Sequence, residues 1–209
     1  MIPPIYPITD TRISVLTHLE QVERLIDGGA TLIQLREKHA SAREFYEQAV
    51  KCVEYARPKG VKIIVNDRVD IAMMTGADGV HLGQDDMPVA AARDLLGNGK
   101  IIGYSTHSVE QAIAAAALGV DYVAIGPIFQ THTKEDPDAA VDLGGVAAVR
   151  CAIGSVPLVA IGGINMANLY DVTNAGADSV AIISGILTDP QGITAAMRQL
   201  RNSLNNVQK

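Results

Sequence analysis

Large aromatic residues are almost absent from this chain of 209 residues. It contains no Trp, and Phe, Trp and Tyr together make up 4%, although 48% of the residues are hydrophobic. A core of this composition must therefore consist mainly of Val, Ile, Leu and Ala. The length suffices for one well-buried domain and nothing in the composition argues for a second, so residues 1–209 are predicted to form a single domain.

Long apolar runs and cysteine motifs are also missing. No run approaches the roughly 18 uncharged residues that a membrane-spanning helix needs, and the start, MIPPIYPITD, lacks the features of a signal peptide. Cys52 and Cys151 lie far from any CxxC spacing, so we expect reduced thiols in a cytoplasmic protein without a membrane partner. A net charge of −6 argues against binding of nucleic acid through broad electrostatic attraction.

Eight short apolar runs rich in Ile and Val recur along the chain at fairly even spacing. Segments whose apolar residues recur with helical periodicity separate these runs. Alternation of this kind predicts parallel strands joined by crossover helices. The predicted strands are residues 4–8, 31–36, 62–65, 79–82, 100–105, 122–126, 157–162 and 179–183.

The number of repeats favours a closed barrel over an open sheet. One strand for about every 25 residues fits a single (βα)8 TIM barrel, which we predict as the fold of this α/β chain. A doubly wound open sheet is the alternative, and it should have fewer strands and a Gly-rich loop after the first one. The first loop here, TDTRIS, contains no Gly.

Local signals mark where several helices begin and end. Ser41 followed by Glu44 predicts a capping box at the start of a helix that should close at Pro58. Residues 189–204 are predicted to form the last helix. The polar tail at 205–209 is expected to be frayed.

Charged side chains follow several of the predicted strands, where a (βα)8 barrel carries its active site. Arg36 and Lys38 end the second strand two residues apart, so both are able to point to the same side. Asp67 and Asp86 follow adjacent strands, about 4.8 Å apart. Two carboxylates at such a short distance repel each other unless they share a proton or a cation. A Mg2+ ion bound by these carboxylate oxygens would remove the repulsion. Such an ion beside the two cationic side chains is the pattern expected of a diphosphate site.

Small residues follow the last two predicted strands. Gly162 and Gly163 come after the seventh, and Ser184 and Gly185 after the eighth. In (βα)8 barrels these two loops commonly bind a phosphate through backbone N–H groups. The pattern predicts a small phosphorylated substrate.

Each of these two interpretations has a simpler alternative. The charged residues at the strand ends could form ordinary surface ion pairs, Arg36 with Asp67 for example, worth under about 1 kcal/mol. The glycines could serve only to make tight turns.

Seven segments together carry a family resemblance. QLREK, VNDR, GVHLGQDD, STH, GPIFQTHTK, AIGGI and ISGI occur in this order from the second strand to the eighth. Their order and spacing resemble the thiamine phosphate synthase family. The resemblance implies a transferase that joins an aminopyrimidine methyl diphosphate to a thiazole phosphate and releases pyrophosphate. It also implies a dissociative reaction through a pyrimidine carbocation.

The resemblance implies roles for individual residues of this chain. Asp67 and Asp86 are expected to bind Mg2+, one ion per subunit. Binding of the pyrimidine diphosphate is implied for Gln34, Arg36, Lys38, Asn66, Ser105 and Lys134, and substrate binding for Leu35 and Glu37 of the same QLREK segment. Binding of the thiazole phosphate is implied for Thr131, Thr133, Gly163, Ile183 and Ser184. Direct catalytic roles are implied for Arg36, Lys38, Ser105 and Lys134.

Some positions depart from the family pattern or invite another function. Gln130 stands where the family usually has Pro, and Tyr104 is bulkier than expected before Ser105. The histidines are not expected to act as bases: His81 should point into the barrel or pack, His107 should orient the loop after the fifth strand, and His132 should face away.

Three other functions are alternatives to the synthase. A thiazole tautomerase would keep the barrel and the thiazole phosphate site, but it needs neither diphosphate-binding cations nor Mg2+ ligands. A non-catalytic regulator that binds a thiazole phosphate should have lost part of the charged set. An isomerase or epimerase of sugar phosphates needs an acid/base pair across the barrel mouth, and none stands out. The sequence is compatible with a homo-oligomer.

Overall fold

All eight predicted strands are present, and they close into a parallel barrel. The computed structural model of the chain describes residues 2–131 and 139–205. Each strand pairs with its neighbours in chain order, and β1 pairs with β8, which closes the barrel and excludes the open sheet. The strands are β1 (Ile5–Thr9), β2 (Leu32–Leu35), β3 (Lys62–Asn66), β4 (Gly79–Leu82), β5 (Ile101–Thr106), β6 (Tyr122–Ile125), β7 (Leu158–Ile161) and β8 (Ser179–Ile182).

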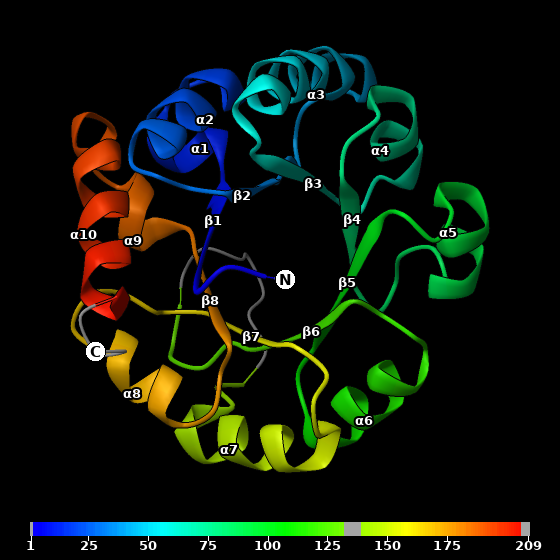
Figure 1. The fold of residues 1–209 in the computed structure, drawn as a ribbon, viewed down its shortest axis with the longest axis vertical. Helices are drawn as coiled ribbons and strands as arrows, with labels where there is room; N and C mark the ends of the chain where they lie inside the picture. Colours follow the sequence, from blue (N-terminus) through cyan, green and yellow to red (C-terminus); the bar gives the residue numbers. More distant parts are fainter. Residues whose placement is uncertain (1, 132–138, 206–209) are drawn as a thin grey trace.

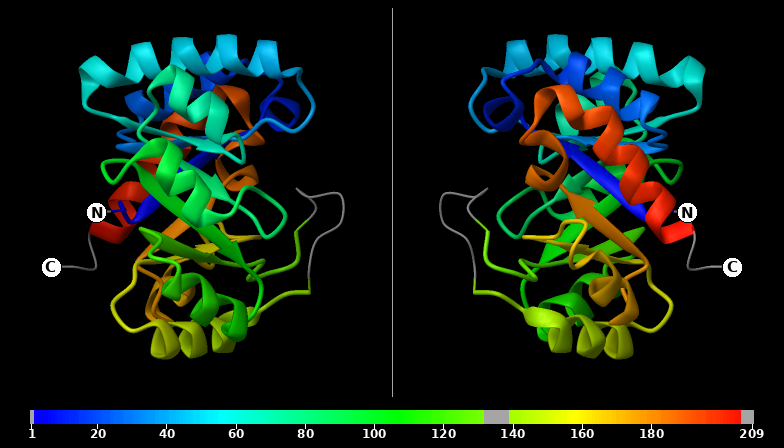
Figure 2. Two further views of the ribbon diagram at one scale, coloured as in Figure 1. Left: turned by 90° about the vertical axis from the view of Figure 1, so that its right-hand side faces the viewer. Right: turned by 90° about the vertical axis from the view of Figure 1, so that its left-hand side faces the viewer.

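Helices surround the barrel on all sides (Figure 1). Figure 2 shows the strands running obliquely across the molecule, with α3 along one side and α7 along the opposite side. The α-helices of the described part are α1 (Thr11–Ser14), α2 (His18–Asp27), α3 (Ala42–Ala56), α4 (Val69–Thr75), α5 (Val89–Leu96), α6 (Val109–Ala117), α7 (Asp142–Ile153), α8 (Leu169–Asn174), α9 (Ser184–Leu187) and α10 (Ile193–Asn205). There are also two 3-10 turns: η1 (Arg57–Lys59) follows α3, and η2 (Pro190–Gly192) precedes α10.

The predicted helix starts and ends are confirmed, with shifts of a few residues. Ser41 and Glu44 form the expected capping box, each side chain bonding to the other's backbone N–H. The helix they start ends at Ala56, and Pro58 lies in the 3-10 turn that follows. The last helix begins at Ile193 and includes Asn205, the first residue of the predicted tail, whereas residues 206–209 lie outside the described part.

The barrel interior is packed by side chains, as in other barrels of this class. Two of the chain's few aromatic residues, Tyr6 of β1 and Tyr122 of β6, are fully buried there and meet edge to face at 5.9 Å. A second, larger apolar core lies between the strands and the helices. Around the tyrosines, the interior contains Ile2, Ile8, Leu32, Ile64, Ala124, Val159 and Ala181.

No helix in the described ranges is long and apolar enough to cross a membrane.

Gly79 of β4 offers a test of how closely the barrel strands pack. A Cβ atom at this position would lie 2.0 Å from the Ile101 carbonyl oxygen of β5, whereas at Gly99 it would meet nothing within 4 Å. We predict that Gly79→Ala lowers the free energy of unfolding by about 1–3 kcal/mol, because the backbone must move to relieve the clash. Gly99→Ala changes the unfolded chain in the same way and should not destabilise. Urea unfolding of both variants checks this, and equal midpoints would contradict it.

Candidate active site

A cavity of about 1390 Å³ opens where the C-terminal ends of the strands meet. It exceeds the roughly 300–1,000 Å³ typical of a site for one small ligand, so it has room for two. Most of the predicted site residues line it together. These are Gln34, Arg36, Lys38, Asn66, Asp67, Asp86, Ser105, Thr131, Gly163, Ile183 and Ser184.

Two other predicted residues of the described part, Leu35 and Glu37, do not line this cavity. The Leu35 side chain is fully buried in the core between the strands and the helices. The Glu37 side chain lines a separate, smaller hollow of about 330 Å³. Thr133 and Lys134 lie outside the described residues, as does His132.

Arg36 is held at the rim of the cavity by an acid from the first loop. Its Nη1 donates to Asp10 Oδ2 at 2.5 Å, and both side chains are largely buried, at 14% and 10% exposure. Asp10 also caps α1, accepting the backbone N–H groups of Arg12 and Ile13. Removing either partner of so buried a pair would leave an uncompensated charge.

Lys38 and two carboxylates form the second charged group at the rim. Lys38 Nζ donates to Asp67 Oδ2 at 2.5 Å, and Asp86 accepts the backbone N–H of Gly83. Asp67 has φ +62°, a left-handed conformation that is uncommon for residues other than Gly and that often marks a functional site. Burial raises the pKa of Asp67 above its usual value and the negative charge of Asp86 adds to this, while Lys38 lowers it. The two acids are therefore close enough to interact, as their positions after adjacent strands predicted.

A chain of hydrogen bonds crosses the floor of the cavity. Gln34 Nε2 donates to the Tyr6 hydroxyl, which lies 3.0 Å from the hydroxyl of Tyr122. His81 then bridges Tyr122, 2.9 Å from its Nδ1, and Ser105, 2.8 Å from its Nε2. Burial raises the pKa of both tyrosines, so both remain protonated at neutral pH. The network links two predicted substrate-binding residues, Gln34 and Ser105, through buried groups.

Two histidines occupy structural positions, as expected. His81 points into the barrel, where both ring nitrogens bond as described above. His107 follows β5, and its Nδ1 lies 2.6 Å from the Gly126 carbonyl oxygen at the start of the next loop. Its backbone N–H donates to Gln111 of α6, so His107 connects the loop after β5 both to α6 and to the loop after β6.

The glycines after β7 have a packing role of their own. A Cβ on Gly163 would lie 2.7 Å from Phe129 Cβ, and one on Gly162 would lie 2.5 Å from Pro127 Cβ. Both also have positive φ, at +66° and +104°. Tight packing thus explains why Gly is needed at both positions, and it also brings the loop after β6 against this side of the cavity.

Comparisons with known proteins agree with this arrangement. Residues 5–186 match the family described as thiamine monophosphate synthase. The thiamine-phosphate synthase of Chloroflexus aurantiacus is 50% identical over 94% of this chain and 90% of its own length. A thiamine phosphate pyrophosphorylase structure from Pyrococcus furiosus superposes with a TM-score of 0.88 at 35% identity, covering 98% of this chain and 96% of that one.

The chain belongs to the thiamine monophosphate synthase family. It is accordingly an enzyme of the transferase class. More distant barrels, such as a 3-hexulose-6-phosphate synthase structure at 20% identity and a TM-score of 0.71, share the fold alone.

Sequence reasoning missed several residues that line the cavity of this family member, among them Asp10, Arg12, Tyr6 and Tyr122. Asp10 and Arg12 lie in the first loop, where an acid directly after a strand was a signal that could have identified this loop as part of the site. Tyr6 and Tyr122 belong to predicted strands. No local pattern shows which strand residues face the barrel interior, because these strands are buried on both faces.

The Tyr122 hydroxyl is predicted to stabilise the fold through its bonds to Tyr6 and His81. Tyr122→Phe removes one hydrogen-bond partner from the buried Tyr6 hydroxyl and one from His81 Nδ1. The substitution should therefore lower the free energy of unfolding by about 1–3 kcal/mol. Tyr46 of α3 is the control, since its hydroxyl makes no hydrogen bond within the described part of the chain. Tyr46→Phe should change stability by less than about 0.5 kcal/mol. Equal urea midpoints for both variants would count against a structural role of the network.

Proposed function

We propose that the enzyme joins 4-amino-2-methyl-5-(diphosphooxymethyl)pyrimidine to 4-methyl-5-(2-phosphooxyethyl)thiazole, giving thiamine phosphate and pyrophosphate. The observation that carries the proposal is the grouping of Arg36, Lys38, Asp67 and Asp86 at the rim of one cavity. Two cations and two acids within a single site suit a ligand that combines a diphosphate with a divalent metal ion.

The carboxylates fit Mg2+ by their chemistry. Asp67 and Asp86 would supply hard oxygen ligands from adjacent strand ends. Burial, together with the negative charge of Asp86, raises the pKa of Asp67 above its usual value. In the described ranges no group of three or more His, Cys, Asp or Glu side chains forms a metal site. Two carboxylates completed by substrate oxygens and water are the usual ligands of Mg2+ beside phosphates. When bound there, the ion would neutralise negative charge on the diphosphate.

The reaction breaks one bond and forms one bond at the same carbon atom. The pyrimidine methylene C–O bond breaks, with both electrons leaving on pyrophosphate, and the thiazole nitrogen then donates its lone pair to that carbon. Negative charge develops on the departing oxygen, so fixed cations are the main requirement. Arg36 is able to grip two oxygens and Lys38 supplies a point charge. No general base is needed, because the thiazole nitrogen carries a free lone pair.

The opposite side of the cavity is proposed to hold the thiazole phosphate. The first backbone N–H groups of α9, from Ser184 and Gly185, have no intrahelical acceptor and border the cavity. Gly163 and Thr131 line the same region. This leaves the pyrimidine diphosphate to the side formed by the ends of β2, β3 and β4. The thiazole tautomerase alternative gives no reason for the charged group on that side.

An assay of the purified protein with both substrates tests the proposal. Thiamine phosphate should form when Mg2+ is present, stop when a chelator is added, and resume when Mg2+ is restored. Failure to form thiamine phosphate under these conditions would contradict the proposed reaction. Formation at full rate in the presence of the chelator would contradict the role of the metal.

Asp67→Asn should lower kcat/KM by about two orders of magnitude or more, because it removes a charged ligand that supports the leaving group. Asp70→Asn is the matched control: Asp70 lies three residues further on, is exposed, and pairs with Arg68 on the outer surface. The control should retain wild-type activity, and circular dichroism should show both variants folded. A mild effect of Asp67→Asn would remove this residue from the proposed metal site.

A further inference from the structure

The side chain of Glu37 lies on the opposite side of the chain from its two neighbours. Arg36 and Lys38 line the large cavity, whereas Glu37 lines the small hollow behind it, together with Thr11 and His18. The Glu37 side chain is only 7% exposed. Its position is therefore not that of a group available to substrate.

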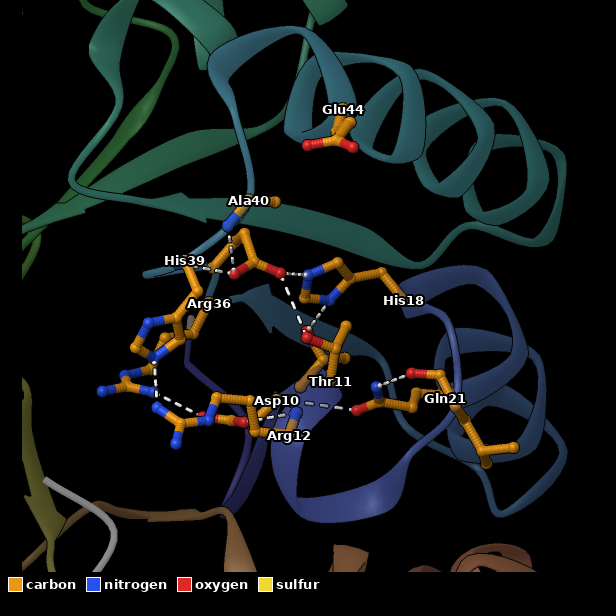
Figure 3. Close-up of polar contacts among 12 residues, drawn as sticks. Asp10, Thr11, Arg12, His18, Gln21, Arg36, His39, Ala40 and Glu44 are labelled. Carbon is orange, nitrogen blue, oxygen red and sulfur yellow. Dashed lines mark hydrogen bonds and ion pairs between the residues drawn. The ribbon is translucent and has the colours of Figure 1, made fainter.

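The Glu37 carboxylate holds the turn that follows β2. Its Oε1 accepts the backbone N–H groups of His39 at 2.8 Å and Ala40 at 3.1 Å. Its Oε2 accepts the Thr11 hydroxyl at 3.1 Å and lies 3.3 Å from His18 Nε2 (Figure 3). A carboxylate with four such partners fixes the backbone around it.

The partners of Glu37 are themselves anchored to rigid elements. His18 is buried at the start of α2, where its Nδ1 lies 2.7 Å from the Thr9 hydroxyl of β1. Its ring also packs against Phe45 of α3. Thr11 begins α1, directly after the Asp10 that pairs with Arg36. The turn after β2 is thus attached to β1 and to α1 and α2, the two helices that follow β1.

We propose that Glu37 is a positioning residue, which fixes the turn at residues 36–40 so that Arg36 and Lys38 both point at the diphosphate of the substrate. Arg36 and Glu37 directly follow β2 and their side chains lie on opposite sides of the chain, with Lys38 on the same side as Arg36. Anchoring Glu37 on the outer side therefore directs both neighbours to the inner side. The role of the two cations rests on the proposed function, whereas the anchoring of the turn does not.

The ionisation of Glu37 suits this position. The hydrogen bond with His18 is the main cause that lowers the pKa of Glu37 below its usual value, and the N–H groups of His39 and Ala40 add to this. The carboxylate thus stays charged at neutral pH and acts as an acceptor for all four partners.

Three variants test this role. Glu37→Ala removes every bond, whereas Glu37→Gln keeps an amide oxygen that is able to accept from His39 and Ala40. Glu44→Ala is the matched control, because Glu44 lines the same hollow but bonds to Ser41 at the start of α3. In Figure 3 its carboxylate stands apart from the bonded cluster.

For Glu37→Ala we expect KM for the pyrimidine diphosphate to rise about tenfold or more, with KM for the thiazole phosphate changed less than about twofold. Inorganic pyrophosphate with Mg2+, titrated calorimetrically, should bind more weakly by a similar factor. The amides of residues 36–40 should exchange faster with solvent. Glu37→Gln should fall between Glu37→Ala and the wild type, and Glu44→Ala should match the wild type in all three measurements.

An equal rise in both KM values, or unchanged pyrophosphate binding and amide exchange, would overturn the proposal. If Glu37→Ala does not fold, the same three measurements on Glu37→Gln and on the wild type test the positioning role. The proposed function fails separately, if the wild type binds pyrophosphate but makes no thiamine phosphate. In that case pyrophosphate binding and amide exchange still test the positioning role.

Discussion

Closure of eight parallel strands brings the carboxyl end of every strand to one rim, and the rest of the site depends on this constraint. Charged residues that follow separate strands, far apart in sequence, are forced into one cavity. There they must neutralise one another, because partly buried charges without partners are costly. Arg36 pairs with Asp10 and Lys38 pairs with Asp67. A ligand that brings both anionic oxygens and a metal ion would find complementary partners already gathered.

Beneath this charged rim, neutral hydrogen bonds hold the floor. The two tyrosines that fill the barrel interior connect Gln34 on one side to Ser105 on the other, through His81. Outside the rim, the Glu37 carboxylate ties the turn after β2 to the helices. The cavity is thus supported from below by uncharged groups and from behind by a buried acid. Arg36 and Lys38 face the cavity between these two supports.

Much of this architecture could be predicted from the sequence. Regular alternation of apolar runs located all eight strands, with ends shifted by a residue or so. The segment TLIQLREKHA indicated a charged strand end, and Arg36 and Lys38 do line the cavity. The direction of Glu37 does not follow from the family resemblance, which covers the whole QLREK segment and does not distinguish the side chains on its two sides. The ion pair between Arg36 and Asp67, an example of the simpler surface-pair interpretation, does not form: Arg36 pairs with Asp10, and Lys38 pairs with Asp67. Such pairings depend on loop geometry that local sequence patterns do not determine.

The most direct test of this arrangement is a crystal structure of the protein with thiamine phosphate, pyrophosphate and Mg2+. We expect pyrophosphate against Arg36 and Lys38, with the metal ion between it and Asp67 and Asp86. The phosphate of thiamine phosphate should lie at Gly163 and Ser184, across the same cavity. Pyrophosphate bound away from the end of β2, or a metal ion held without either aspartate, would contradict it.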